Sequence, residues 1–426
     1  MKDNAAWLFL EPHVHLIRQD GVLLFYNTLS KTVLEFDASP AIRKLATDLL
    51  NPANGYVVAL SHKQLDKPEI RGFIERLRHD FLGDLLDASW SLGKPVNIVP
   101  EPFVRHGFSR PTTTPSAFSP ELDARNYIHE LTLYLNSAEL PVPTPFSTAW
   151  RQFSFPGCTT GKPGEMDLRL VRTLIDDVNQ YTPTLIHLSG MNILHYQSLP
   201  EVVGILGKSP FQKKYHLRLA DWDHHILPFL VNQKQTTIAL YITFPTEPET
   251  VAGYLRTLPD LKLMKKLEFN LVVGNPEELQ MALELVNTLD LTNIFFKPLF
   301  TGENLDFFRE QVFVSREEIL AARPDQQQVL SRISVNEHDF GKLSILPDGE
   351  VYANLNDPMV GDATTSTLMQ LVISELDNGV SWRRSRKEVS PCAACRYQFL
   401  CPPVSSYEIF MNRYHFCHVY PNGEEV

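Results

Sequence analysis

Cysteine is scarce in this chain: only five of its 426 residues are cysteine, and four of these lie between residues 392 and 417. Long apolar runs are missing too, because no stretch approaches the roughly 18 residues that a membrane helix needs. Residues 1–7 lack the apolar core of a signal peptide. These absences predict a cytoplasmic protein with no membrane partner, in which structural disulfides are not expected.

An excess of basic residues is also missing. The chain has 39 Lys and Arg against 50 Asp and Glu, a formal net charge of −11. This argues against a nucleic-acid partner, because nucleic-acid-binding surfaces are basic. The run Arg-Arg-Ser-Arg-Lys at 383–387 is the exception, and such a run is typical of a solvated face, with a partner-binding surface as the alternative. A hydrophobic content of 43% fits a folded protein with a sizeable core.

What the chain does have is a cysteine pattern. Cys392, Cys395, Cys401 and Cys417 follow the spacing C-x2-C-x5-C-x15-C. Thiolates are soft ligands, and four of them in one short stretch suit zinc or an iron–sulfur cluster. The alternatives are two disulfides or unconnected buried thiols. The fifth cysteine, Cys158, is expected to be a buried, idle thiol.

The cysteine pattern resembles the auxiliary-cluster half of the SPASM domain, the C-terminal extension of radical SAM peptide maturases. That family has further cysteines, which hold a first auxiliary cluster. In this chain Asn354 stands where the family's G-x4-C step, counted from Gly349, has cysteine, and Ser405 ends the C-x3-C step. The resemblance therefore implies one 4Fe-4S cluster at Cys392, Cys395, Cys401 and Cys417, with zinc as the alternative metal.

The middle of the chain alternates short apolar runs with helical stretches. The runs lie at residues 131–135, 184–188, 216–219, 237–242, 267–273 and 293–296. This alternation predicts a parallel sheet with helices between its strands. Six such units before a SPASM-like tail resemble the partial (β/α)6 barrel of radical SAM enzymes.

Two motifs of that family are absent from the expected barrel. Active members carry C-x3-C-x2-C after the first strand, but residues 136–145 contain no cysteine, and Cys158 is followed only by Thr159 and Thr160. The family's Gly-Gly-Glu loop after the second strand is replaced by Ser189-Gly190-Met191. The resemblance thus implies a degenerate barrel that does not bind SAM, and a protein that is not itself an enzyme.

The first 90 residues predict three strands and two helices. The strands lie at residues 13–17, 22–26 and 32–36, with a turn at Asp20-Gly21. A helix begins after Ser39-Pro40, and a second helix spans residues 67–80. This order resembles the winged-helix-like precursor-recognition element of peptide-modifying systems, in which a leader peptide adds a strand to the sheet edge.

That resemblance places a bound peptide between the third strand and the last helix. The residues concerned are Thr32, Val33, Leu34, Glu35, Phe36, Phe73 and Leu77. A proline at Leu34 is expected to weaken peptide binding if the Leu34 N–H faces the peptide. The alternative is a small structural cap domain.

One further cluster contains metal-ligand residue types. Asp221-Trp222-Asp223-His224-His225 combines carboxylates with imidazoles after a predicted strand, where barrel folds carry function. A solvated loop is nevertheless the expected form of this segment, since no second group of ligands accompanies it, and a metal site is the alternative.

The chain is therefore expected to be an α/β protein in four parts. These are a winged-helix-like precursor-recognition domain (1–92), a proline-rich linker (93–125), a degenerate radical-SAM-like partial barrel (126–325) and a SPASM-like cysteine-rich domain (326–426). This arrangement resembles the pseudo-radical-SAM/SPASM proteins of Bacteroidetes peptide natural-product (RiPP) systems. The resemblance implies an accessory protein that binds a ribosomal precursor peptide and presents it to a partner radical SAM maturase. The alternatives are an enzyme or electron-transfer subunit that uses the cluster, and a zinc-stabilised interaction protein.

Overall fold

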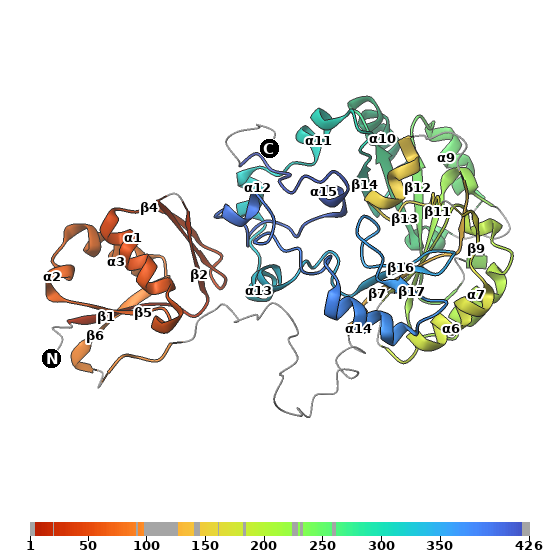
Figure 1. Ribbon diagram of the computed structural model, residues 1–426. Coiled ribbons are helices and arrows are strands. Elements are labelled where there is room, and N and C mark those ends of the chain that lie inside the picture. Colours follow the sequence, from red (N-terminus) through yellow and green to blue (C-terminus); the bar gives the residue numbers. More distant parts are fainter. Residues whose placement is uncertain are drawn as a thin grey trace.

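The computed structural model describes residues 5–19, 21–90, 93–97, 127–139, 145–160, 162–181, 185–223, 229–230, 233–257 and 261–419. Figure 1 shows a small N-terminal unit beside a larger α/β unit, with part of the cysteine-rich tail between them. Most of the predicted linker, 93–125, lies outside the described residues.

The N-terminal unit contains two three-stranded antiparallel sheets. The order in one sheet is β2 (Val14–Gln19), β3 (Val22–Asn27) and β4 (Val33–Asp37), so the three predicted strands are confirmed. The second sheet has the order β5 (Val57–Leu60), β1 (Ala6–Leu10) and β6 (Gly83–Asp87), and it was not predicted.

Helices α1 (Pro40–Leu50) and α3 (Pro68–His79) share one core with the strands of this unit, and the short α2 (His62–Leu65) adds only the partly buried Leu65. As predicted, Ser39 caps α1 by accepting the backbone N–H of Ile42 at 3.4 Å. Apolar side chains recur every three or four residues along both helices, so each helix has one buried face. Those of α3 are Ile70, Phe73, Ile74 and Leu77.

The larger unit is built on a nine-stranded sheet. Six parallel strands follow one another in chain order, which confirms the predicted alternation: β7 (Glu130–Tyr134), β10 (Leu185–Ser189), β11 (Gln212–Arg218), β12 (Thr236–Thr243), β13 (Leu267–Val273) and β14 (Ile294–Pro298). The helices between them are α6 (Leu168–Val178), α7 (Leu199–Leu206), α9 (Pro248–Leu255) and α10 (Pro276–Leu289).

The tail extends this sheet. Strand β15 (Lys342–Ile345) pairs with β7 in parallel, and β16 (Glu350–Tyr352) and β17 (Gly361–Asp362) continue it in antiparallel order. The remaining elements are short: β8 (Asn136–Ser137), β9 (Gly164–Glu165), α5 (Ala149–Gln152), α11 (Leu305–Gln311), α12 (Arg316–Ala321), α13 (Gln326–Ser334), α14 (Leu368–Asn378) and α15 (Ser406–Phe410).

The two faces of the large sheet differ in chemistry. Apolar side chains such as Leu131, Ile186 and Leu240 are fully buried and belong to the main core, which also includes apolar residues of helices α6, α7, α9 and α10. On the other face the side chains are mostly polar, and they line a cavity described below. Because side chains alternate along a strand, each strand serves both faces.

The N-terminal unit is anchored on the tail. Ile17, Leu24 and Tyr26 share a buried apolar cluster with residues of α12, α13 and the segment 397–401. The Tyr26 hydroxyl donates to the carbonyl of Pro324 at 2.6 Å, and Thr28 donates to Gln326 at 2.7 Å. The sheet β2-β3-β4 is therefore buried on both faces, which explains why five consecutive residues of β3 are buried.

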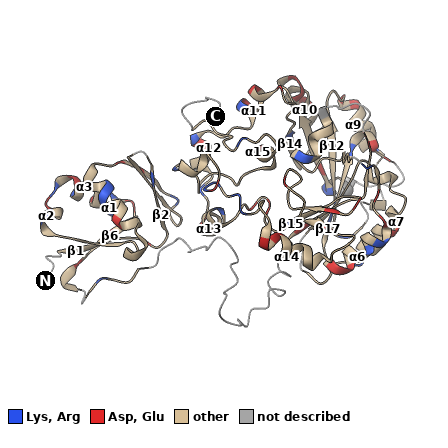
Figure 2. Ribbon diagram, viewed as in Figure 1, with Lys and Arg blue, Asp and Glu red and all other residues tan. Residues whose placement is uncertain are grey.

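Charges of both signs are mixed along the helices, as on α6 in Figure 2. In the described part of the chain, no helix combines the length and the apolar character needed to cross a membrane.

Candidate functional site

The four clustered cysteines line a single cavity. Cys392, Cys395, Cys401 and Cys417 surround a space of about 200 Å³ between α12, α15 and the segment 391–403. Cys392 opens a short 3-10 turn, Cys392–Ala394, and Cys395 ends it. Cys417 lies beside Val314 through a parallel β-bridge. Residues up to 25 positions apart in the sequence are thus brought to one point, while Cys158 lies elsewhere, fully buried.

The surroundings of the thiols combine burial with polar contacts. Burial raises the pKa of Cys392 to about 11, although the guanidinium of Arg386 opposes the shift. Burial also raises the pKa values of Cys395 and Cys401. An Arg386 N–H lies 3.7 Å from the Cys392 sulfur, and the backbone N–H of Tyr397 donates to the Cys395 sulfur at 3.4 Å. Such N–H donors stabilise thiolates once a metal has displaced their protons.

The four thiols supply a donor set that suits more than one metal group. Four thiolates can hold one tetrahedral zinc ion or one four-iron cluster. As they lie around this cavity of about 200 Å³, no group of three or more His, Cys, Asp or Glu in the described ranges is arranged to hold a single ion.

The basic run 383–387 is internal, so neither predicted reading of it is correct. Arg386 is buried and pairs with Glu408 of α15 at 2.5 Å. Arg384 forms a bidentate pair with Asp357, at 2.9 and 2.6 Å. Arg383 donates to backbone carbonyls at the end of α14. These guanidiniums join segments of the tail, and only a structure could show their carboxylate partners.

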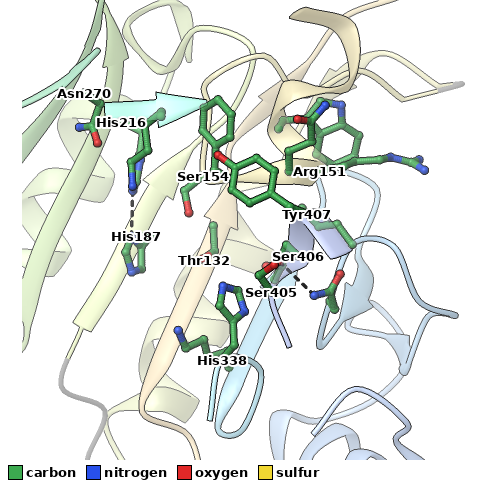
Figure 3. A pocket seen from close by; sticks show the side chains of 18 of the residues that line it. Thr132, Arg151, Ser154, His187, His216, Asn270, His338, Ser405, Ser406 and Tyr407 are labelled. Atoms are coloured by element: carbon green, nitrogen blue, oxygen red, sulfur yellow. Dashed lines mark hydrogen bonds between the residues drawn. The ribbon is translucent and has the colours of Figure 1, made fainter. Parts of the chain in front are cut away.

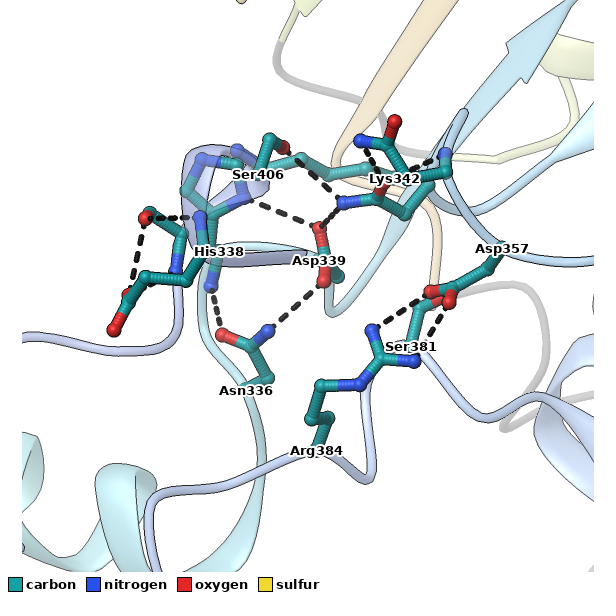
Figure 4. Close-up of polar contacts among 12 residues, drawn as sticks. Asn336, His338, Asp339, Lys342, Asp357, Ser381, Arg384 and Ser406 are labelled. Carbon is teal, nitrogen blue, oxygen red and sulfur yellow. Dashed lines mark hydrogen bonds and ion pairs between the residues drawn. The ribbon is translucent and has the colours of Figure 1, made fainter. Parts of the chain in front are cut away.

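Hydrogen bonds occupy the region where the resemblance implies a lost first cluster (Figure 4). The Asn354 amide donates to Asp339 at 2.9 Å and to the Ser406 hydroxyl at 3.2 Å. The Asn336 amide donates to the other Asp339 oxygen at 2.9 Å. Ser405 caps α15, accepting the Glu408 N–H at 3.3 Å. Amide, hydroxyl and carboxylate groups thus connect the same segments that thiolates would connect.

The segment that follows β7 is hydrogen-bonded to the loop that follows β10. Residues 140–144 of the cysteine-free stretch lie outside the described residues. The carbonyl of Gly190 accepts the N–H of Gly157 at 2.9 Å, and the Met191 N–H donates to the Asn136 carbonyl at 2.9 Å. A Cβ at position 190 would lie 2.4 Å from the Asn136 side-chain oxygen, so only glycine fits there. Burial raises the pKa of Cys158 to about 12, as expected for an idle thiol.

Aromatic rings fill the adjoining end of the sheet. Phe153 and Phe155 both pack against Tyr241, with ring centroids 6.4 and 5.5 Å apart. Beyond them a cavity of about 500 Å³ lies at the carboxyl ends of β11 and β12. Its single charged lining residue, Arg218, is paired with Asp221 at 2.7 and 2.9 Å.

The alternative of a metal site at 221–225 is not supported by the contacts of its described residues. Asp221 is engaged by Arg218, and Trp222 stacks near Tyr254, with ring centroids 5.6 Å apart. His224 and His225 lie outside the described residues.

Strand β4, where the peptide was predicted to bind, forms an edge of its sheet. The Asn27 N–H donates to Thr32, and the Ala38 N–H donates to Gly21, both at 3.0 Å. Hydrogen-bonded pairs alternate along an antiparallel ladder, so Leu34 and Phe36 direct their backbone groups toward β3. The backbone groups of Val33, Glu35 and Asp37 therefore face the open edge. Leu34 is the wrong position for a proline test.

The side chains predicted to bind the peptide have different surroundings. Phe73 and Leu77 are 0% exposed, so they support β4 from below and do not line an open groove, which corrects that part of the prediction. The Phe36 ring packs on Phe73, with centroids 5.3 Å apart. Glu35 points to the opposite face, where it accepts from Arg316 at 2.9 Å and from the Tyr397 hydroxyl.

A polar cavity of about 470 Å³ lies on the inner face of the large sheet, and the sequence did not predict it. Figure 3 shows His187 and His216 joined across its wall. Their ring nitrogens are 2.8 Å apart, and the other nitrogen of His216 lies 3.0 Å from the Tyr241 hydroxyl. The far nitrogen of His187 lies 3.5 Å from Glu130, which also pairs with Lys342 at 3.3 Å. The signal for this cavity in the sequence was the single polar residues that interrupt the apolar runs of the strands.

These contacts shift the pKa values of Glu130 and His216. The His187 ring and Lys342 outweigh burial and lower the pKa of Glu130 to about 2. Burial, with His187 nearby, lowers the pKa of His216 well below its ordinary value, so His216 is neutral. Three of the four ring nitrogens have a hydrogen-bond partner, and the fourth, Nε2 of His187, has only the ion-pair contact with Glu130.

No protein-family model matches the sequence, and neither does any curated protein. The chain is similar to the crystal structure of Streptococcus suis SuiB bound to precursor peptide SuiA, with 10% identity, a TM-score of 0.47, and coverage of 96% of this chain and 98% of that one. It is also similar to native anSMEcpe with bound AdoMet and Cp18Cys peptide, with 13% identity, a TM-score of 0.42, and coverage of 64% and 87%. Likenesses of this size do not establish a shared function.

Proposed function

We propose that this protein is a non-catalytic, pseudo-radical-SAM accessory protein that binds a ribosomal precursor peptide and presents it to a partner radical SAM maturase. In this proposal the nine-stranded sheet is a degenerate partial barrel, and the tail is a SPASM-like domain with one 4Fe-4S cluster. The observation that carries peptide binding is the register of β4, which leaves the backbone groups of Val33, Glu35 and Asp37 at an open sheet edge.

Strand addition at this edge is physically favourable. Unpaired N–H and C=O groups along an edge strand form a template for a peptide in extended conformation. Strand β4 is held rigidly for this purpose, because Phe36 packs on the buried Phe73 while Glu35 is bonded to Arg316. A preorganised edge lowers the entropy cost of binding.

The contacts at the carboxyl ends of the strands, here called the mouth of the sheet, support the absence of SAM chemistry. The Gly190 carbonyl already accepts an N–H within the protein, and Arg218 is already paired. Phe153 and Phe155 pack on Tyr241 at this end of the sheet. The described part of the mouth thus offers neither thiolates for a cluster nor a free charged group for a cofactor.

The four tail cysteines fit a four-iron cluster in number and donor type. When bound, such a cluster would join the segment 391–403 to Cys417 and would supply one-electron transfer. Arg386 would lie beside it, because its guanidinium contacts Cys392 and is fixed by Glu408.

Two titrations of the full-length protein, purified anaerobically, test this proposal. Calorimetry with SAM should show no binding, and no 5′-deoxyadenosine should form under reducing conditions. A synthetic precursor peptide, encoded beside this chain, should bind, and a version without its leader half should not. Micromolar SAM binding with 5′-deoxyadenosine formation would overturn the non-catalytic role, and equal binding of the leaderless peptide would overturn recognition at β4.

A further inference from the structure

The polar cavity on the inner face of the large sheet has an uneven balance of charge. It is enclosed by strands β7 to β15 on one side and by tail residues such as His338 and Ser406 on the other (Figure 3). Inward positions that could have been filled by apolar side chains carry lysine, histidine and glutamate instead. A large cavity lined by a few convergent polar groups is the usual form of a ligand site.

The acidic groups in this cavity already have partners within the protein. Glu130 faces Lys342 at 3.3 Å and His187 at 3.5 Å, and Glu268 is paired with Lys214. Asp339 accepts from Asn336 and Asn354. None of these carboxylates is available to a further cation.

One ammonium group has no such partner. Lys297 of β14 forms no ion pair or hydrogen bond with any residue in the described ranges, and its closest marked contact is the Phe295 ring, 5.7 Å from Nζ. Burial lowers the pKa of Lys297 and Lys214 adds to the shift, while Glu268, which is itself paired with Lys214, opposes it. A half-buried charge without a partner is costly, so an incoming anion would be stabilised there.

We propose that this cavity binds a carboxylate against Lys297, with the carbon chain that carries it resting on Phe295. Phe295 lies two residues before Lys297 on the same face of β14, lines the cavity and is 44% exposed. A carboxylate carries one negative charge, which the Lys297 ammonium balances, whereas the second charge of a phosphate would find the neighbouring Lys214 already paired with Glu268. The identity of the ligand as an acidic side chain of a bound peptide rests on the proposed function. The preference of the site for a carboxylate is independent of that function.

Short blocked peptides test the site without a leader. The probes are acetyl-Gly-Phe-Glu-Gly-amide, its Gln counterpart, and acetyl-Gly-Phe-Gly-Gly with a free C-terminus, each titrated into the full-length protein. The Glu peptide should bind about ten-fold more tightly than the Gln peptide, as expected for one charge-assisted contact. Raising the salt concentration from about 50 to about 500 mM should shrink this ratio. Comparable binding of the free C-terminus would identify a main-chain carboxylate as the source and would still support the site.

Matched variants connect the result to Lys297. Lys297→Gln should bring the Glu and Gln peptides within about two-fold of each other, and Lys297→Arg should keep the preference, which excludes misfolding as the cause. Arg151→Gln removes the same charge from another lining position, where the guanidinium stacks on Trp150, and should leave the ratio unchanged. Equal binding of the two peptides by the unmodified protein, or no binding of either, would overturn the proposal. A proline at Val33 should not alter the ratio, so failure here is distinguishable from failure of leader recognition.

Discussion

At the scale of single residues, one unfavourable feature of the fold is a buried carboxyl group. Glu375 of α14 is 1% exposed, and one of its oxygens has no hydrogen-bond partner. Burial raises its pKa to about 7, although Arg383 opposes the shift. Gly379 leaves the space for this side chain, since a Cβ there would lie 2.2 Å from the Glu375 carboxyl carbon.

This carboxyl group should make stability depend on pH. Its folded pKa lies above its ordinary value of 4.5, so the folded state keeps a proton between pH 4.5 and about 7 that the unfolded state has lost. The free energy of unfolding should therefore fall as pH rises through this window, by at most roughly 3 kcal/mol. Glu375→Gln should remove this fall and be more stable than the unmodified protein at pH 8, as measured by urea unfolding.

An exposed acid on the same helix provides the control. Asp377→Asn removes one negative charge from a solvated position two residues further on. It should leave the pH dependence as it is in the unmodified protein. If Glu375→Gln and the unmodified protein lose stability in parallel from pH 5 to pH 8, another group is responsible.

At the scale of elements, β4 separates two kinds of backbone position. The ladder to β3 uses the N–H groups of Leu34 and Phe36, and the open edge carries those of Val33 and Glu35. Proline substitutions distinguish them, because proline removes one N–H and is tolerated at the first residue of an edge strand.

Val33→Pro should weaken binding of the precursor peptide by about ten-fold, the effect of one lost hydrogen bond. The domain should stay folded, because this N–H makes no bond within the sheet. Fluorescence anisotropy with a labelled peptide gives the affinity, and circular dichroism gives the folded fraction.

Two further variants complete this series. Leu34→Pro should destabilise the fold by about 3 kcal/mol, because it breaks the ladder to β3. Val33→Ala keeps the N–H and should bind within about two-fold of the unmodified protein. If Val33→Pro binds as well as Val33→Ala, the peptide does not pair with β4.

At the scale of the whole molecule, the peptide edge and the cysteine site meet. Tyr397 lies between Cys395 and Cys401 in the sequence, and its hydroxyl donates to Glu35 of β4. Cys401 belongs to the same buried cluster as Leu24 and Tyr26 of the N-terminal unit. In the proposed account, metal binding by the tail would therefore stabilise the surface on which the N-terminal unit is seated.

The sequence could predict what depends on local pattern. Apolar runs with helices between them predicted six strands, and the spacing of Cys392 to Cys417 indicated a shared ligand site. Pairings between distant segments could not be read in this way: β15 joins β7 across more than 200 residues, and β1 finds β5 and β6. The residues that line the polar cavity could not be identified for the same reason. The face of the sheet to which His187 or Lys297 points depends on the strand register.

Burial of charge was equally hidden in the sequence. Arg384 and Arg386 look like a solvated run, and only the folded tail brings Asp357 and Glu408 to them. Phe73 and Leu77 have the spacing of a helix face, but the sequence does not say whether that face meets a peptide or the core of its own domain.

The iron content of the protein decides whether the tail holds one four-iron cluster and the larger unit holds none, as we propose. Anaerobic reconstitution of the full-length protein should give about four irons and about four acid-labile sulfides per chain, the content of one four-thiolate cubane. Cys392→Ala should lose the cluster, and Cys158→Ala should keep it. Seven or eight irons per chain, or one zinc and no sulfide, would contradict the account.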